Sequence, residues 1–345
     1  MKRAASLTIL LASLAFFPPT AFAEPYTVVT YNLGLLRVFG SDYVPAVQAR
    51  TRAAPAALTA FVTAEKPRIM LLEEVWEDAA ADAIRKALTP LGYSAVKPNV
   101  HSIIGLTSGL LLLVREPLRV SEWKFTPFSR TTFLDSFARK GVLEAVLEEP
   151  STGARFAVVG THTVAVDTNN GQPKDKGQLD AILAQADQIR AAVTARSSHG
   201  SLPVLLLGDF NVGPGYVDSV YRRISGLEGL RESGEALGID SSLVTWDPGN
   251  PLVRYGSYPN EPPAKIDHVF LLDGSGAFWT PTAARVVMSE AQPGLSLTPK
   301  GSAAPVPTPL SDHYAFLAEV DLSPRQGRRR APTGGGLPAA VSPAA

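Results

Sequence analysis

Eight short runs rich in apolar and β-branched residues recur along the chain, and several follow one another without a helix between them. The runs cover residues 26–32, 69–74, 110–115, 141–147, 155–162, 204–209, 266–272 and 314–320. Helical patterns separate some of them, over residues 47–65, 78–88 and 178–195. A strictly alternating parallel fold would need a helix after every strand. The mixture therefore predicts an α/β fold with two mixed or antiparallel sheets packed face to face and helices outside them.

The apolar run over residues 204–207 ends abruptly in Gly208, Asp209, Phe210 and Asn211. If the strand continues, Asp209 and Asn211 share one face and Phe210 packs behind them, because successive side chains point to opposite faces. Gly, Asp and Asn are also favoured in turns, so the same residues fit a tight turn. A carboxylate beside an amide suits a site that holds a water or hydroxyl together with an anionic oxygen.

Other apolar runs end in polar side chains in the same way. The residues at or near these ends are Asn32, Glu73, Glu74, His162, Asp267, Asp312 and His313. A charged or amide group at the end of a buried strand costs free energy unless a partner satisfies it. One such residue is commonly a cap or a turn, but six such strand ends in one chain point to a shared pocket.

The donor types in this set favour a hard cation. The chain has no cysteine, and oxygen ligands are those that Mg²⁺ prefers. Glu74 and Asp312 are the candidate ligands, with Asn32 assisting, and Mn²⁺ is a possible substitute. Zinc fits less well, because no His-x-x-x-His or similar ligand spacing occurs.

The five histidines differ in their sequence context. His101 and His199 are expected to lie in polar or Gly-containing loops, and His268 is expected to face the opposite way from Asp267. His162 and His313 therefore remain as the predicted pair in the site. A histidine beside a carboxylate suits acid–base chemistry near neutral pH, and a buried carboxylate such as Asp267 would fix its tautomer.

Both ends of the chain read as segments outside the fold. Residues 1–23 combine Lys2 and Arg3 with an apolar run and a small-x-small ending, the pattern of a secretory signal peptide, so we expect export and cleavage near Ala23. Residues 325–345 form an Arg-, Pro-, Gly- and Ala-rich tail that is expected to be disordered. Residues 24–324 then form one domain. Of 32 basic residues six lie in the two ends, which leaves 26 against 32 acidic residues in the body.

Taken in the order in which they occur along the chain, the polar motifs resemble those of the endonuclease/exonuclease/phosphatase superfamily of metal-dependent phosphodiesterases. The motifs cover nearly the whole predicted domain: Tyr31-Asn32, Glu73-Glu74-Val75, Thr161-His162, Gly208-Asp209-Phe210-Asn211, Ile266-Asp267-His268 and Ser311-Asp312-His313. The resemblance implies a four-layer α-β-β-α sandwich with the site at one edge of the two sheets. It also implies a hydrolase acting on phosphoric ester bonds by in-line attack of water.

The resemblance assigns metal binding to one group of residues. It implies that Glu74 is the principal Mg²⁺ ligand and that Asn32 and Asp312 lie near the metal. The family commonly has Gln where this chain has Glu73. That difference adds a possible charge but leaves Glu74 in place.

The resemblance assigns catalysis and phosphate binding to a second group. Asp209 would align or deprotonate the attacking water, and Asn211 and His162 would hold phosphoryl oxygens. Asp267 and His313 would stabilise the transition state or act as base. Which of Asp209 and His313 takes the proton stays open.

Three further features resemble the secreted neutral sphingomyelinase and phospholipase C branch of this superfamily: the Asp135–Lys140 spacing, the segment after Thr161-His162-Thr163, and Thr245-Trp246-Asp247. The resemblance implies a phospholipid headgroup at a membrane surface as substrate, with Lys140 in substrate binding. Asp135 and Lys140 also fit a surface ion pair, and Trp246 fits the core. An interfacial enzyme needs exposed apolar residues, for which the candidates are Trp123, Phe125 and Phe128, or Phe278 and Trp279.

Other functions remain open at this point. An exported endonuclease or exonuclease is the main alternative, although the mildly acidic body offers no broad basic surface for a nucleic acid. A phosphomonoesterase is a further one. An inactive binding module is disfavoured, because every expected site residue is present. The sequence indicates no protein partner, and we expect a monomer.

Overall fold

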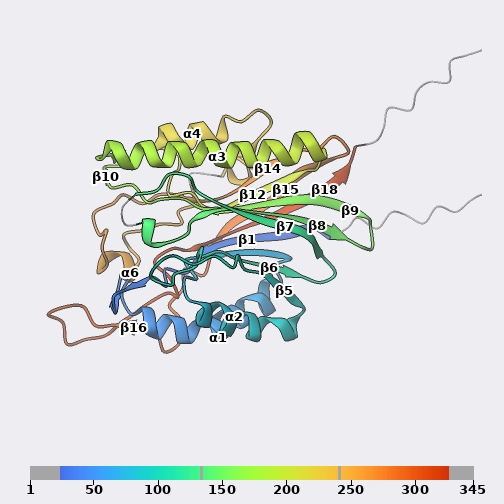
Figure 1. The fold of residues 1–345 in the computed structure, drawn as a ribbon. Coiled ribbons are helices and arrows are strands. Elements are labelled where there is room, and N and C mark those ends of the chain that lie inside the picture. Colours follow the sequence, from blue (N-terminus) through green and yellow to red (C-terminus); the bar gives the residue numbers. More distant parts are fainter. Residues whose placement is uncertain (1–23, 133–134, 240–241, 326–345) are drawn as a thin grey trace, which may run out of the picture.

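The computed structural model describes residues 24–132, 135–239 and 242–325, and within them the chain forms four layers. Two sheets lie face to face in the middle, α3 and α4 cover one side, and α1 and α2 cover the other (Figure 1). The predicted four-layer α-β-β-α sandwich is thereby confirmed. The predicted signal peptide and the tail from residue 326 onward lie outside the described residues.

The first sheet has six strands in the order β15-β18-β1-β4-β6-β5. β1 and β4 are parallel, and every other pair in this sheet is antiparallel. In that order the bounds are Ala277–Val287, Ala315–Pro324, Tyr26–Asn32, Ile69–Glu73, Leu111–Arg115 and Tyr93–Val96.

The second sheet repeats this plan with six strands in the order β13-β14-β12-β9-β8-β7. β12 and β9 are parallel, and the other pairs are antiparallel. In that order the bounds are Arg231–Glu232, Asp267–Leu272, Val204–Asp209, Ala154–His162, Gly141–Glu149 and Arg119–Pro127.

The helices lie outside the sheets as predicted. α1 (Val47–Glu65) and α2 (Asp78–Leu88) have the predicted bounds, whereas α3 (Lys176–Gly200) is longer than residues 178–195. It begins earlier because the side chain of Asp175 accepts a hydrogen bond from the backbone N–H of Gln178 and caps the helix. The remaining elements are α4 (Asp218–Ser225), α5 (Ser233–Ala236), α6 (Pro251–Arg254), η1 (Thr89–Leu91), η2 (Asp135–Phe137), β2 (Arg37–Val38), β3 (Ser41–Asp42), β10 (Thr168–Asn169), β11 (Gln172–Pro173), β16 (Ser296–Leu297) and β17 (Val306–Pro307).

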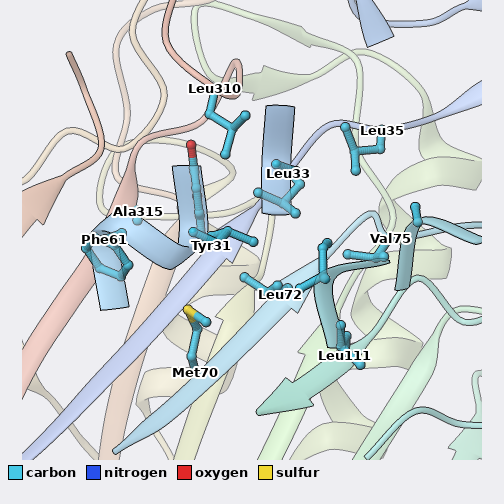
Figure 2. Close-up of a cluster of buried hydrophobic side chains, with 14 of the residues drawn as sticks. Tyr31, Leu33, Leu35, Phe61, Met70, Leu72, Val75, Leu111, Leu310 and Ala315 are labelled. Atoms are coloured by element: carbon cyan, nitrogen blue, oxygen red, sulfur yellow. The ribbon is translucent and has the colours of Figure 1, made fainter. Parts of the chain in front are cut away.

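Three large apolar clusters fill the spaces between the four layers. One joins α1 and α2 to the first sheet, and Figure 2 shows Phe61 of α1 near Ala315 of β18, with Met70 and Leu72 of β4 in the same cluster. A second lies between the sheets, and a third joins α3 and α4 to the second sheet. Because side chains alternate along a strand, Leu205 and Leu207 of β12 enter the cluster between the sheets. Polar residues that follow them at the same two-residue spacing, at the end of the strand, therefore also face the other sheet.

Among the described residues, we find no helix that combines the length and the apolar character needed to cross a membrane.

A buried ion pair stabilises the second sheet close to Asp267. Glu232 and Lys265 are both buried, with 2.7 Å between Oε2 and Nζ, and Glu232 also caps α5 through the backbone N–H groups of Gly234 and Glu235. Burial alone would raise the pKa of Glu232. The hydrogen bond to His268 and the charge of Lys265 outweigh burial and lower that pKa to about 2, below the ordinary 4.5.

We expect Glu232→Gln to lower the free energy of unfolding by about 3 kcal/mol at neutral pH, because it leaves Lys265 buried without its counter-charge. The pKa of Glu232 is lower in the folded protein, so its contribution is fully present above about pH 4.5 and is lost as the pH falls toward about 2. Urea unfolding at several pH values measures this. The difference between the variant and the wild type should shrink over that range, and the exposed control Glu228→Gln should change little.

Candidate active site

The strand registers place the predicted polar residues side by side at one edge of the sandwich. In the second sheet Asp209 is opposite His162 on one side and Asp267 on the other. In the first sheet Asn32 is opposite Glu73. These side chains continue the alternation that points Leu205 and Leu207 into the space between the sheets. The site is therefore the polar end of the apolar layer between the two sheets.

Asn32 joins the two sheets at this edge. Its Nδ2 donates to Asp209 Oδ2 at 2.8 Å and lies 3.3 Å from Glu74 Oε1. Its Oδ1 accepts the backbone N–H of Gly34 at 2.9 Å. Asn32 thus lies beside Glu74 as predicted, and in this orientation it faces the two carboxylates with its amide nitrogen.

His313 and Asp267 form the predicted hydrogen-bonded pair. His313 Nδ1 and Asp267 Oδ2 are 3.0 Å apart, and the other ring nitrogen, Nε2, lies 3.8 Å from Asp209 Oδ2. Burial alone would lower the pKa of His313, but the charges of Asp267 and Asp209 outweigh burial and raise it well above its ordinary value. The Asp267 carboxylate therefore fixes the ring orientation and favours the imidazolium.

The segment after Asp209 is a turn and does not continue the strand. β12 ends at Asp209, and Asn211 has a left-handed backbone with φ of 51°. The prediction that the two share one strand face is wrong, because the backbone N–H of Asn211 donates to Asp209 Oδ1 at 2.8 Å and closes the turn. Both still line one cavity, and Phe210 is buried behind them as predicted. Asn211 Nδ2 donates to Thr163 O at 3.1 Å, which leaves its second N–H for another acceptor.

Glu74 and Asp312 suit a divalent cation. Glu74 makes only long contacts, 3.3 Å from Asn32 Nδ2 and 3.4 Å from Trp76 Nε1, and its backbone is left-handed with φ of 56°. Burial in the cavity and the nearby charge of Asp312 raise the pKa of Glu74. Two carboxylates that line one cavity, one of which has its charge disfavoured by the other, are the donor set that Mg²⁺ would satisfy. These residues therefore fit the predicted metal.

A second group of possible ligand atoms consists of Asp209, Asp267 and His313, whose nearest ligand atoms all lie within 4.8 Å of one another. In this group Asp267 Oδ2 and His313 Nδ1 already share a hydrogen bond, and both oxygens of Asp209 accept from Asn32 and Asn211. Glu74, whose oxygens have weaker partners, is the better ligand candidate.

Glu73 is buried in surroundings that disfavour its charged form. Its side chain is fully buried, Thr30 Oγ1 donates to its Oε1 at 2.5 Å, and its Oε2 has no partner among the described residues. Burial and the charge of Asp267 raise the pKa of Glu73 well above its ordinary value. A carboxyl in its protonated form has the shape and hydrogen-bonding capacity of the Gln that the family resemblance implies at this position.

Lys140 is a buried part of the site, so the alternative of a surface ion pair with Asp135 is wrong. Its Nζ lies 2.7 Å from Asp135 Oδ1, 3.2 Å from His162 Nε2 and 2.9 Å from Thr163 O. Burial and the charge of Lys140 lower the pKa of His162 well below its ordinary value. His162 is therefore neutral beside a cation, while His313 is held as a cation beside carboxylates.

These side chains line a cavity of about 580 Å³. Its polar lining consists of Glu74, Lys140, His162, Asp209, Asn211, Asp312 and His313. Its aromatic lining includes Trp76, Phe137, Tyr216, Trp246 and Tyr258. Trp246 is half-buried, and its ring centroid lies 5.0 Å from that of His313, so it belongs to the cavity wall and not to the core.

His268 and His101 lie apart from this cavity. His268 Nε2 bonds to Val212 O behind the sheet, as its predicted opposite orientation requires. His101 is exposed and bonds to Asp78. His199 falls within α3 and not in a loop as predicted.

Arg50 is a positioning residue that the sequence did not reveal. It is fully buried in α1, and its guanidinium donates to the carbonyls of Leu33, Gly34 and Leu310 on the loops that carry Asn32 and Asp312. Gly34 is needed at the same place, because a Cβ there would lie 2.3 Å from Asp312 Oδ1. A buried arginine spaced from its carbonyl partners along the chain leaves no local pattern in a sequence.

Solved structures share this fold. SmcL aligns with a TM-score of 0.67 and 17% identity, and sphingomyelinase C from Streptomyces griseocarneus with 0.63 and 21%. TDP2 from D. rerio, complexed with a single-stranded DNA product, aligns with 0.61 and 16%. Each alignment covers 86% of this chain and 99% of the other. No curated protein matches the chain by sequence.

The chain has the two-sheet sandwich of hydrolases that act on phosphoester bonds. Carboxylates, an amide and imidazoles lie at one edge of this sandwich. The model of the Endonuclease/Exonuclease/phosphatase family matches residues 29–313, nearly the whole described part of the chain. The chain belongs to this family. Members are typically dependent on a divalent metal, which agrees with the donor set around Glu74.

Proposed function

We propose that this protein is a Mg²⁺-dependent phosphodiesterase that cleaves the headgroup of a choline-type phospholipid. Water would attack phosphorus, so that one P–O bond forms and the bond to the lipid oxygen breaks, releasing phosphocholine and a lipid alcohol. The water proton passes to Asp209, or to His313 when its imidazole is neutral, and the leaving oxygen takes up a proton. A bound cation would offset the negative charge that develops on the phosphoryl oxygens.

The composition of the cavity walls is the observation that carries this proposal. Tyr43 and Tyr258 both line the cavity, with 2.5 Å between their hydroxyl oxygens, and Tyr216 Oη lies 3.5 Å from Glu261 Oε2. Aromatic faces beside a carboxylate favour a quaternary ammonium group. Elsewhere in the cavity lining, the second N–H of Asn211 can donate to a phosphoryl oxygen, and Lys140, which shares the acceptor Thr163 O with Asn211, supplies a positive charge nearby. The cavity lining thus offers groups complementary to both charges of a zwitterionic headgroup.

Charge argues against a nucleic acid as the substrate. The chain between its two ends carries 26 basic and 32 acidic residues. Apart from the metal-site and catalytic carboxylates, Asp135, Asp167 and Glu261 also line the cavity, and of these Asp135 is paired with Lys140. Binding to a polyanion gains most of its free energy from phosphate contacts with Lys and Arg, and among the described residues Lys140 is the one such side chain in the cavity lining.

Removing the ammonium of Lys140 tests the assignment of the phosphate-binding groups. We expect Lys140→Ala to reduce phosphocholine release from sphingomyelin or phosphatidylcholine vesicles with Mg²⁺ by about 100-fold or more, because it removes a positive charge close to the phosphoryl oxygens, on which negative charge develops. The matched control Lys124→Ala, which removes an exposed lysine of β7, should keep activity. Duplex DNA, single-stranded DNA and an inositol phosphate are assayed alongside. Degradation of DNA with intact lipid would overturn the lipid substrate and favour the nuclease alternative.

Export is part of the same proposal and rests on the pattern in residues 1–23. We expect protein recovered from outside the cytoplasm to begin near Glu24, and N-terminal sequencing measures this. An uncleaved N-terminus on the recovered protein would contradict this expectation.

A variant truncated after Pro324 should fold and turn over substrate like the full chain, because the tail has no periodic apolar face.

A further inference from the structure

Phe39 occupies the tip of a hairpin that opens beside the cavity. It links β2 to β3, and both tip residues have positive φ, 50° for Phe39 and 82° for Gly40. Such two-residue turns favour Asn or Gly at the first position, and Phe there is strained. The side chain is nevertheless 83% exposed. The hairpin therefore holds a large apolar group in water although neither the turn nor the core requires it.

Ile103 lies on a neighbouring loop and is 91% exposed. The next residue, Ile104, packs with Leu36 against a small cluster that contains Trp76 and Leu106. Leu36 directly precedes β2, so this cluster joins the loop of Ile103 to the hairpin of Phe39. The two exposed side chains extend from loops that pack against each other.

Phe137 completes an apolar surface with these two side chains. Its ring packs edge-on against that of Phe39, with 6.3 Å between the centroids. We call Phe39, Ile103 and Phe137 the apolar rim. Phe39 and Phe137 also border the cavity, together with Leu36 and Leu106. The exposed apolar surface is therefore continuous with the wall of the active site.

The aromatic residues singled out in the sequence do not form such a surface. Trp279 and Phe128 are buried, and Phe125 packs toward the space between the sheets. Phe278 is 36% exposed but pairs with Ser323, at the opposite end of β18 from His313. Trp123 is exposed halfway along the edge strand β7, opposite Ala145.

We infer that the apolar rim docks this protein on a lipid surface and holds the mouth of the cavity over the headgroups. The inference rests on the proposed function, since a lipid surface is the occupant that also supplies a ligand for the adjoining cavity. Side chains at loop tips suit shallow insertion at the boundary of headgroups and acyl chains. The acidic balance of the body favours a zwitterionic surface over an anionic one.

Sedimentation with phosphatidylcholine–sphingomyelin vesicles tests the docking without depending on turnover. Phe39→Asn places a residue preferred in this turn, and Ile103→Ser changes an exposed loop residue, so both variants should fold. We expect each to weaken vesicle binding about tenfold or more, because each removes a large side chain that is buried on docking. Phe278→Ser, at the far end of the sandwich, is the matched control and should bind like the wild type.

Hydrolysis of the soluble diester bis(p-nitrophenyl) phosphate separates docking from chemistry. Ile103→Ser should keep this activity while losing vesicle binding. Vesicle binding that is unchanged in both rim variants, or absent in the wild type, would overturn the docking. Docking that depends on the rim without release of phosphocholine would support the surface and contradict the proposed substrate. If both variants released phosphocholine at wild-type rates, the proposed substrate would be supported and docking through the apolar rim would be contradicted.

Discussion

Glu74→Gln is expected to reduce phosphoester hydrolysis by about 1000-fold or more, because it removes the carboxylate best placed to hold the metal. Glutamine keeps the size of the side chain and the left-handed backbone at φ of 56°, so the fold should persist. Chelation should abolish the activity of the wild type, and Mg²⁺ or Mn²⁺ should restore it. The steady-state rate with and without added metal measures both effects.

A binding measurement makes this test independent of turnover. Mg²⁺ that binds the folded state should raise the midpoint of thermal unfolding of the wild type but not of Glu74→Gln. Glu77→Gln is the matched control, since it makes the same change at an exposed residue three positions away. Full activity of the wild type in chelator, or a normal Mg²⁺ response of Glu74→Gln, would show that the metal site is wrong.

The interior strands could be predicted from the sequence because each is an apolar run that ends where polar side chains begin. The strands over residues 26–32 and 204–209 have the predicted bounds. Edge strands carry no such signal. Most residues of β7 are exposed and polar, and β15 has few buried residues, so neither shows a clear apolar pattern. Both sheets were consequently predicted without these outer strands.

The site could be predicted where motif residues meet through the strand register. Asp267 and His313 are 46 positions apart, and their hydrogen bond follows from a motif order already present in the sequence. The turn at Asn211 and the burial of Lys140 depend on tertiary contacts with Asp209, His162 and Thr163. The raised pKa of Glu73 depends on its burial, which residue type alone does not reveal.

His313→Ala is expected to lower kcat by about 1000- to 10,000-fold while substrate binding changes little, the pattern of a group that acts mainly in the transition state. The structure supports this because His313 Nε2 faces the Asp209 carboxylate while Nδ1 is held by Asp267. His101→Ala removes an exposed histidine that lies apart from the cavity and is the matched control.

The pairing with Asp267 gives a stricter expectation. Asp267 acts by orienting the His313 ring, so Asp267→Asn should also lower kcat strongly, but the double variant should be no worse than His313→Ala alone. Circular dichroism and thermal unfolding check that both variants fold. If the two losses instead multiply, Asp267 acts separately from His313. Near wild-type kcat in His313→Ala would leave Asp209 as the group that takes the proton from water.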